Sequence, residues 1–399
     1  MTVKLSDKIP VTKRSGDQMK QNISEYIRGQ EPMELLKKLV SIDTRGPSGN
    51  EMDMIAFIME YLKPEEGRYE IIPHGANRGS MILTIPGQEK EKIILLGHMD
   101  TVPSGDSALW RHPPLSGHLS GKRLYGSGAS DMKSGLAVLL ITAGYLMKYG
   151  GNKKTVCLML TADEECGCTG AKAIREGAYM DDACMILVAE PTDGKIAVAE
   201  KGVMWIRISA LGKQAHGAMP RQGLNANEYL WESISLLKSR IKNMNQSEGK
   251  AKTTLSTTVF HGGEKCNIIP GKANAILDIR TVLEEDHNRI REYLKDIAAK
   301  IQEEKGVEVM FDIINEKYPL RNPSITEPVR NLMDCSGESK TICIPYYTDL
   351  AELLKNRFTA FAVLGPGSIE QMHKTNEWAE VDKIHTVTEQ YLNYITDYC

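Results

Sequence analysis

Short apolar runs separated by helical stretches dominate the first part of the chain and return near its end. The runs lie at 93–96, 155–160, 184–188 and 358–364. Short apolar runs bounded by turn residues are typical of strands that a parallel sheet buries on both faces. The stretch 135–149 is apolar almost throughout, which predicts a buried helix. This pattern favours an α/β fold in which a mixed, largely parallel sheet is flanked by helices.

The pattern is different between residues 197 and 317. Apolar and polar residues alternate at 203–210, 254–262, 273–281 and 307–314, and longer amphipathic stretches occupy 226–244 and 284–304. Such alternation predicts half-exposed strands, and the longer stretches predict helices. We therefore expect an inserted α+β domain of the ferredoxin-like type at 197–317, between two parts of the first domain at 1–196 and 318–399. Residues 1–22 are polar and predict a solvated arm.

Histidine and carboxylate residues follow the predicted strands of the first domain or precede its buried helix. They are His98, Asp100, Asp131, Glu164, Glu165, Glu190 and His373. The carboxyl ends of parallel strands lie along one edge of a sheet, so we expect these side chains to gather there. Imidazoles with carboxylates and no thiolate suit hard or borderline divalent metals. Any one of these residues could instead be a turn or capping residue, as Asp131 before its helix illustrates.

Several acidic groups at one place repel each other unless cations are bound. Two metal ions that share a bridging carboxylate would relieve this repulsion, activate a water and polarise a carbonyl group. The adjacent Glu164 and Glu165 cannot readily point at the same atom from an extended chain. The simplest division makes one of them a metal ligand and the other a general base.

The composition is that of an ordinary globular protein. The 399 residues are 41% hydrophobic and 25% charged, with a formal net charge of −3. This balance predicts neither nucleic-acid binding nor a polybasic membrane anchor, and no apolar run reaches the length of a membrane span. The eight cysteines match no disulfide framework. We therefore expect a cytoplasmic protein with reduced thiols.

Motifs in one order along nearly the whole chain carry a resemblance to a known family. They include 97–103 (GHMDTVP), 125–133 (YGSGASDMK), 163–165 (DEE), 190–191 (EP), 212–216 (GKQAH), 267–270 (NIIP), 278–280 (DIR) and 365–377 (GPGSIEQMHKTNE). The chain resembles the M20 metallopeptidases, which are co-catalytic zinc amidohydrolases. The family includes acetylornithine deacetylase, succinyl-diaminopimelate desuccinylase, aminoacylase and glutamate carboxypeptidases.

The resemblance implies a role for each residue of the predicted metal centre. His98 and Glu190 would bind one metal ion, Glu165 and His373 would bind the other, and Asp131 would bridge the two. Zinc is the expected metal, although cobalt or manganese would fit the same ligands.

The resemblance also implies roles for residues outside the ligand set. Asp100 would orient His98, and Glu164 would be the general base that moves a proton from the attacking water to the leaving amine. His216 would hydrogen-bond to the oxyanion from the other subunit of a homodimer formed through the inserted lid domain. Arg280 would bind the substrate carboxylate, and Asn267 would lie beside Arg280.

The resemblance implies hydrolysis of the amide bond of an N-acylated amino acid, such as an acetylornithine- or succinyl-diaminopimelate-like substrate. A dipeptidase or carboxypeptidase of the same family is the alternative, since both present a carboxylate to Arg280. A non-catalytic protein that binds acylated amino acids is disfavoured because Glu164 and all five ligands are present. Where many deacylases carry Gly-Gly-Thr-Asp or Gly-Gly-Thr-Ser near the substrate pocket, this chain has 346–349 (YYTD), and the two tyrosines would narrow or re-line that region and add hydroxyl donors.

Overall fold

The computed structural model of the chain describes residues 16–47, 49–245 and 251–398, so most of the predicted N-terminal arm lies outside the described residues. From Gly16 the chain forms helix α1 (Gly16–Gly29), where the sequence predicted an arm up to residue 22. The chain divides into two compact units. Unit 1 contains the residues up to Ile196, Ile325–Lys340 and the residues from Thr359 onward, and unit 2 contains Ala197–Ser324 and Thr341–Phe358.

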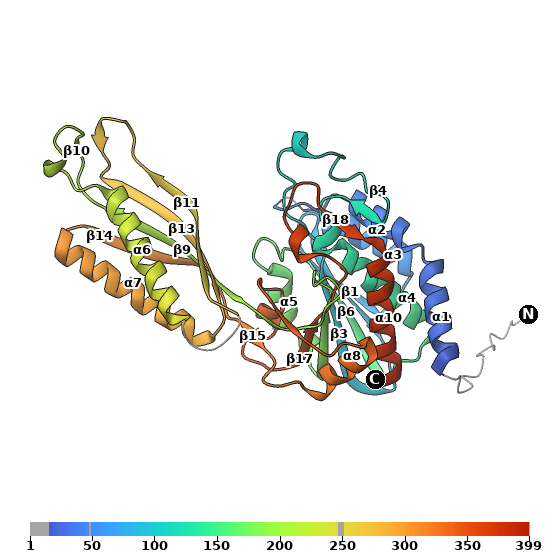
Figure 1. Cartoon of the computed structure of the whole chain (residues 1–399). Coiled ribbons are helices and arrows are strands. Elements are labelled where there is room, and N and C mark those ends of the chain that lie inside the picture. The colour runs from blue at the N-terminus through green and yellow to red at the C-terminus, as the bar shows by residue number, and fades with distance from the viewer. Residues whose placement is uncertain (1–15, 48, 246–250, 399) are drawn as a thin grey trace, which may run out of the picture. The chain divides into compact units, whose positions relative to one another are not determined.

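Unit 1 is built on a mixed sheet whose central strands are parallel (Figure 1). Its strands are β1 (Tyr69–Gly75), β2 (Arg78–Ile85), β3 (Glu89–His98), β6 (Lys154–Thr161), β7 (Ala183–Val188) and β17 (Ala360–Val363), in the spatial order β1-β2-β6-β3-β7-β17. Strands β6, β3, β7 and β17 run parallel, whereas β1 and β2 are antiparallel to their neighbours. Strands β3, β6 and β7 contain three of the predicted apolar runs, and β17 lies within the fourth, 358–364, so the predicted fold class is confirmed.

Helices cover the sheet of unit 1. The helices are α1, α2 (Pro32–Ser41), α3 (Glu51–Leu62), α4 (Ser134–Tyr149), α5 (Thr169–Glu176), α8 (Glu327–Ser336) and α10 (Val381–Tyr398). Helix α4 packs on β3 and also contacts α2, α3 and α10, which explains why it is apolar on nearly every side. A small antiparallel sheet of β4 (His118–Ser120), β5 (Arg123–Tyr125) and β18 (Trp378–Glu380), not predicted from the sequence, links the segment before α4 to the segment before α10.

Unit 2 contains a four-stranded antiparallel sheet with two helices on one face (Figure 1). The strands are β9 (Gly202–Leu211), β11 (Thr254–Gly262), β13 (Lys272–Thr281) and β14 (Glu308–Lys317), in the order β11-β13-β9-β14, and the helices are α6 (Ala226–Met244) and α7 (Glu284–Lys305). Alternate residues of β9 and β13 pack with the apolar stripes of both helices in one core. This core is the one that the alternating pattern predicted.

Shorter elements complete unit 2. They are the strand pair β10 (Ala215–His216) with β12 (Ile268–Ile269), strand β8 (Ala197–Glu200) with β15 (Leu320–Arg321) and β16 (Ile342–Ile344), and helix α9 (Leu350–Leu353). The sequence suggested an insertion at 197–317, and the compact unit that begins at Ala197 runs to Ser324 and takes in Thr341–Phe358.

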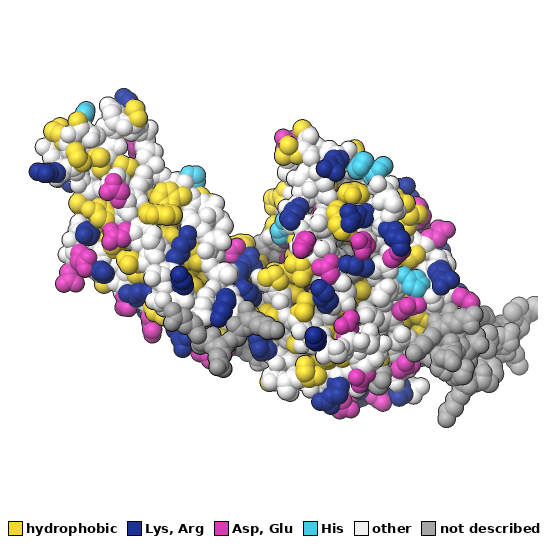
Figure 2. Space-filling model, viewed as in Figure 1, with side chains coloured by type: hydrophobic (Ala, Val, Ile, Leu, Met, Phe, Trp, Pro, Cys, Tyr) yellow, Lys and Arg dark blue, Asp and Glu magenta, His cyan; other side chains and the backbone are white. Residues whose placement is uncertain are grey.

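Acidic and basic side chains are interspersed on the visible face of both units, in keeping with the small net charge (Figure 2). Among the described residues, no helix combines the length and the apolar character needed to span a membrane. No disulfide joins the cysteines of the described part of the chain.

Candidate metal centre

The sheet of unit 1 places three of the predicted segments next to each other. Strand β3 ends at His98, which is in register with Thr161 at the end of β6, and Leu96 is in register with Val188 at the end of β7. The turn after β6 contains Glu164 and Glu165, and the turn after β7 contains Glu190. Parallel pairing therefore gathers these side chains at the carboxyl edge of the sheet.

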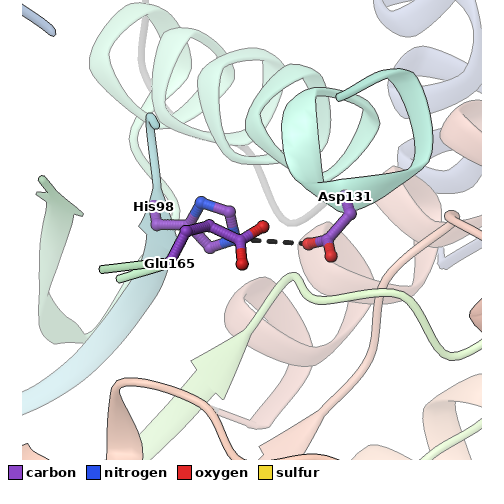
Figure 3. A group of neighbouring side chains, drawn as sticks. All are labelled: His98, Asp131 and Glu165. Atoms are coloured by element: carbon purple, nitrogen blue, oxygen red, sulfur yellow. Dashed lines mark hydrogen bonds and ion pairs between the residues drawn. The ribbon is translucent and has the colours of Figure 1, made fainter. Parts of the chain in front are cut away.

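The side chain of Asp131 lies between the two predicted histidine ligands. Its Oδ1 is 3.2 Å from Nε2 of His98, and its Oδ2 is 3.3 Å from Nε2 of His373. Each histidine also faces a glutamate, because His98 Nε2 is 3.4 Å from Oε1 of Glu190 and His373 Nε2 is 2.9 Å from Oε1 of Glu165. Figure 3 shows how His98, Asp131 and Glu165 converge from three separate segments.

Asp100 fixes the ring of His98 and the turn after β6. The Nδ1 atom of His98 lies 2.9 Å from the carbonyl oxygen of Asp100 and 3.7 Å from Oδ1 of its carboxylate. A carbonyl oxygen only accepts, so Nδ1 carries the proton and Nε2 is directed at Asp131 and Glu190. The two carboxylate oxygens of Asp100 accept the backbone N–H groups of Glu164 and Glu165, each at 3.1 Å.

Burial and mutual charge shift the pKa values of these groups strongly. Burial works against protonation of His98, but the nearby carboxylates of Glu190 and Asp131 outweigh it and raise its pKa well above the ordinary value. Hydrogen bonds to Asp131 and Glu165 raise the pKa of His373 to about 10. Burial raises the pKa of Glu165, and the negative charge of Asp131 adds to that effect. The centre thus holds more carboxylates than its two imidazoles can neutralise.

The donor set fits two divalent cations. Ligand atoms of His98, Asp131 and Glu165 all lie within 4.8 Å of one another. Asp131 presents one oxygen to each histidine, which is the arrangement required of a bridging carboxylate. Imidazole nitrogens with carboxylate oxygens are suitable ligands for zinc, cobalt or manganese, and cations would offset the repulsion among the acidic groups.

Glu377 takes part in this architecture but was not among the predicted site residues. Its carboxylate accepts the backbone N–H groups of Gly128, Ser130 and Asp131 at 2.8, 2.7 and 2.9 Å. Burial raises the pKa of this carboxyl to about 8. In the sequence, Glu377 stands out only as the last residue of the motif 365–377. Its hydrogen bonds to backbone N–H groups could not be predicted, because every non-proline residue offers such a group.

Unit 2 holds the remaining predicted residues, at two places. His216 lies exposed in β10, paired with Ile268 of β12, and Asn267 is beside it because the N–H group of Gly217 donates to the Asn267 carbonyl oxygen at 2.7 Å. Arg280 lies near the other end of β13, where its guanidinium binds both carboxylate oxygens of Asp278 at 2.8 and 3.1 Å.

The expectation that Asn267 lies beside Arg280 is wrong within one chain. Strand β13 begins at Lys272, which pairs with Leu211 near the β10–β12 pair, and Arg280 pairs with Val203 at the opposite end of β9. At about 3.3 Å per residue, nearly the full length of β13 separates the two, roughly 25 Å. The β10–β12 pairing holds Asn267 with His216 instead.

Tyr347 lies close to Arg280. The centre of its ring is 5.8 Å from the guanidinium carbon of Arg280, within reach of a cation–π interaction. The segment that differs from the common deacylase motif therefore borders the predicted carboxylate-binding residue.

A model of the family described as "Peptidase family M20/M25/M40" matches residues 94–397, which is most of the chain. The chain belongs to this family. The M20 match covers every residue of the centre described above, and this M20 chain is a metal-dependent amidohydrolase.

Two curated relatives align with most of the M20 chain. It is 26% identical over 400 residues to the "Probable succinyl-diaminopimelate desuccinylase" of Staphylococcus aureus (strain MSSA476), which covers 92% of this chain and 95% of that protein. It is 29% identical over 360 residues to the "Acetylornithine deacetylase" of Shigella sonnei (strain Ss046), which covers 87% of this chain and 91% of that protein.

A solved structure shows the same fold. The YXEP protein of Bacillus subtilis, described as a dinuclear metal binding peptidase from the M20 family, superposes with a TM-score of 0.68 at 16% identity, over 94% of this chain and 98% of that one. At this level of identity the likeness establishes the fold.

Proposed function

We propose that this M20 chain removes the acyl group from an N-acylated amino acid by hydrolysis at a centre of two divalent metal ions. The observation that carries the proposal is the run of contacts from Glu190 through His98, Asp131 and His373 to Glu165. Two of the relatives are named for deacylation of such compounds.

In the proposed centre, His98 and Glu190 hold one ion, Glu165 and His373 hold the other, and Asp131 bridges them. When bound, the two ions would polarise the scissile carbonyl and lower the pKa of a water at the centre. Zinc is the metal that we propose, with cobalt and manganese as substitutes on the same donors. Asp100 keeps the proton of His98 on Nδ1, so that Nε2 has a lone pair available for the ion.

Glu164 is the proposed general base. It lies buried in the turn after β6, and its backbone N–H group is fixed by the carboxylate of Asp100. The Glu164 carboxylate would take a proton from the attacking water and deliver it to the nitrogen of the leaving amine. The proton therefore starts on the water and ends on the amine, and no other acid is required.

Arg280 is the proposed anchor for the substrate carboxylate. Asp278 holds its Nε and Nη2 atoms, which keeps the planar guanidinium in a fixed orientation while the other amino group remains for a ligand. Tyr347 beside it would limit the width of the same pocket.

The experiment for this proposal is amine release by the zinc- or cobalt-loaded protein from a panel of compounds. The panel contains N-acetylornithine, N-succinyl-diaminopimelate, neutral N-acetyl amino acids and dipeptides. We expect chelator-sensitive cleavage of one acyl class. Cleavage of dipeptides alone would instead establish the second candidate function, a peptidase, which the description of the YXEP protein favours.

We also propose that the chain forms a homodimer through unit 2, with β11 and α6 in the interface. Strand β11 is an edge strand, and its residues Thr254–Gly262 include no Lys, Arg, Asp or Glu. Charged side chains normally protect exposed edges against pairing, and the opposite edge strand, β14, carries them. Trp231 of α6 and Phe260 of β11 are 55% and 39% exposed and line one shallow pocket with Lys238 and Thr257. Hydrophobic side chains are visible over this part of unit 2 in Figure 2.

The dimer would explain why His216 and Arg280 lie so far apart in one copy. If His216 reaches the metal centre of the partner, two different inactive variants should rescue each other when mixed. We would mix the Glu164→Gln and His216→Ala proteins after reversible dissociation. About half of the dimers would be hybrids with one complete site each, so about one quarter of the wild-type activity should return.

The Phe260→Glu variant tests the interface itself. A buried charge at the proposed interface should produce a monomer in sedimentation equilibrium, whereas the same change at Met310 on the opposite edge strand should leave the dimer intact. A dimeric Phe260→Glu protein, or a mixture that stays inactive, would contradict the proposed dimer.

We place the protein in the cytoplasm, which the absence of disulfides among the described cysteines supports.

A further inference from the structure

The carboxylate of Glu377 is buried and accepts hydrogen bonds from three backbone N–H groups. Glu377 is only 3% exposed. Its Oε1 atom accepts from Ser130 at 2.7 Å and from Asp131 at 2.9 Å, and its Oε2 atom accepts from Gly128 at 2.8 Å. Hydrogen bonds from several N–H groups to one carboxylate are among the stronger ones in proteins. These hydrogen bonds offset the loss of hydration that a buried carboxylate suffers.

These three N–H groups belong to the turn that carries the bridging ligand. Gly128 has a φ of +74°, and this left-handed residue turns the chain so that the N–H groups of Gly128, Ser130 and Asp131 can face a single anion. Asp131 is itself one of the three donors, so the bond acts on the backbone of the ligand directly.

Glu377 also belongs to the loop that carries His373. A second contact between the same two loops is reciprocal: the N–H group of Ser368 donates to Oγ of Ser130 at 2.7 Å, and this hydroxyl donates to the Ser368 carbonyl oxygen at 3.0 Å. Glu377 lies after His373 and Ser368 lies before it. The two contacts therefore bracket the histidine and join its loop to the turn of Asp131.

We propose that Glu377 is a positioning residue that sets Asp131 against His373 and thereby determines the affinity of the metal position formed by His373 and Glu165. His98 lies at the end of a sheet strand, and Asp100 orients it independently of Glu377. Because Asp131 is shared by both positions, removing the carboxylate should weaken the position of His373 and Glu165 more than the position of His98 and Glu190. This inference rests on the proposed two-metal centre.

The decisive variant is Glu377→Gln. Glutamine keeps the volume and one accepting oxygen, but its NH2 group faces N–H donors where a carboxylate oxygen stood. We expect the wild-type protein to bind two cobalt ions in titration calorimetry. In the variant, the affinity for one ion should fall by about 10- to 100-fold while that for the other falls less. The cobalt absorption spectrum should lose the contribution of the weakened position, and added metal should restore turnover.

Two controls separate positioning from a general structural role. Glu370→Gln changes an exposed carboxylate on the same loop and should bind both ions like the wild type. Glu377→Asp keeps the charge and should recover part of the lost affinity. The melting temperature of each metal-free protein is measured in parallel, because a mere structural contact would lower it and weaken both ions equally without rescue by metal.

The outcomes are distinguishable. Equal weakening of both ions with a lower melting temperature, or unchanged binding of both, would overturn the positioning role of Glu377. A wild-type protein that binds fewer than two ions would overturn the proposed two-metal function instead.

Discussion

The candidate metal centre of unit 1 and the predicted site residues of unit 2 are assembled in different ways. In unit 1, parallel strands β3, β6 and β7 all end at the same edge of the sheet, and five candidate ligands from distant segments lie in one run of contacts. In unit 2, His216 and Arg280 lie near opposite ends of one antiparallel sheet. All five candidate metal ligands therefore meet within one chain, whereas His216 and Arg280 of the same chain lie far apart.

The direction of neighbouring strands explains why the two sets of residues are placed so differently. Parallel strands bring their carboxyl ends together, so side chains after successive strands meet whatever their spacing in the sequence. Antiparallel strands reverse direction, and residues before and after one strand lie a whole strand length apart. A centre whose ligands gather at the carboxyl edge of parallel strands can bind metal within one chain. Residues at opposite ends of an antiparallel sheet can contact the same substrate only if a second copy of the chain or another element brings the site to them.

The largest effect is expected from the Glu164→Gln variant, which should lose turnover but keep the metal ions of unit 1. Loss of the general base should reduce turnover by about 100- to 10,000-fold, because proton transfer from water to amine would lack its carrier. Metal content and melting temperature should stay at wild-type levels, since the contacts that join the candidate ligands remain. Steady-state amine release and elemental analysis measure the two effects, with the exposed Glu176→Gln as the control. Near-native turnover would refute the assignment of the base.

The His216→Ala variant tests the divided region. We expect turnover to fall by about 100-fold, because a hydrogen-bond donor to the oxyanion is lost. Metal content should not change, since His216 lies in unit 2 and the candidate ligands lie in unit 1. The exposed neighbour Gln222→Ala is the matched control, and unchanged turnover and KM in His216→Ala would remove His216 from the mechanism.

The Arg280→Lys variant asks whether the other end of the sheet binds substrate. Lysine keeps the charge but lacks the planar fork that Asp278 orients, so KM should rise by about 10-fold while kcat changes less. The exposed Arg207→Lys on β9 of the same sheet is the control. Substrate kinetics with an unchanged KM would make Arg280 a structural ion-pair partner of Asp278.

Folding stability, rather than turnover, should respond to pH between about 4.5 and 8, the ordinary and the raised pKa of Glu200. Burial raises the pKa of Glu200 from 4.5 to about 8, although the Thr348 hydroxyl donates to its carboxylate. Because the folded pKa is the higher one, the contribution of this group is complete below the unfolded pKa and is lost as pH rises through the folded pKa. Stability should fall by up to about 1.4 kcal/mol per pH unit in that window.

The Glu200→Gln variant keeps the volume without a charge, so its melting temperature should fall less than that of the wild type as pH rises from about 4.5 to about 8. Exposed Glu308→Gln should behave like the wild type. Parallel curves for Glu200→Gln and wild type would show that this carboxyl does not titrate in the folded chain over that range.

The sequence alone was sufficient for the parts that depend on periodicity and strand direction. Apolar runs identified β3, β6, β7 and β17, and the polar residues after them pointed to His98, Glu165 and Glu190 because parallel strands end at one edge. Period-two alternation identified β9 and β13 with nearly correct bounds, because one face of each strand is buried against the helices and the other is not. The resemblance to the M20 family then named His373 and Asp131 as partners, and the structure brings them together.

The contacts between loops could not be predicted from the sequence, because they depend on how distant segments pack. The three N–H groups that bind Glu377 belong to the backbone, and every non-proline residue has such a group, so no residue pattern could predict this contact. Asn267 was expected beside Arg280, but the two-residue β10–β12 pairing holds it with His216. Pairs this short have no periodicity to detect, and their position follows from tertiary packing instead.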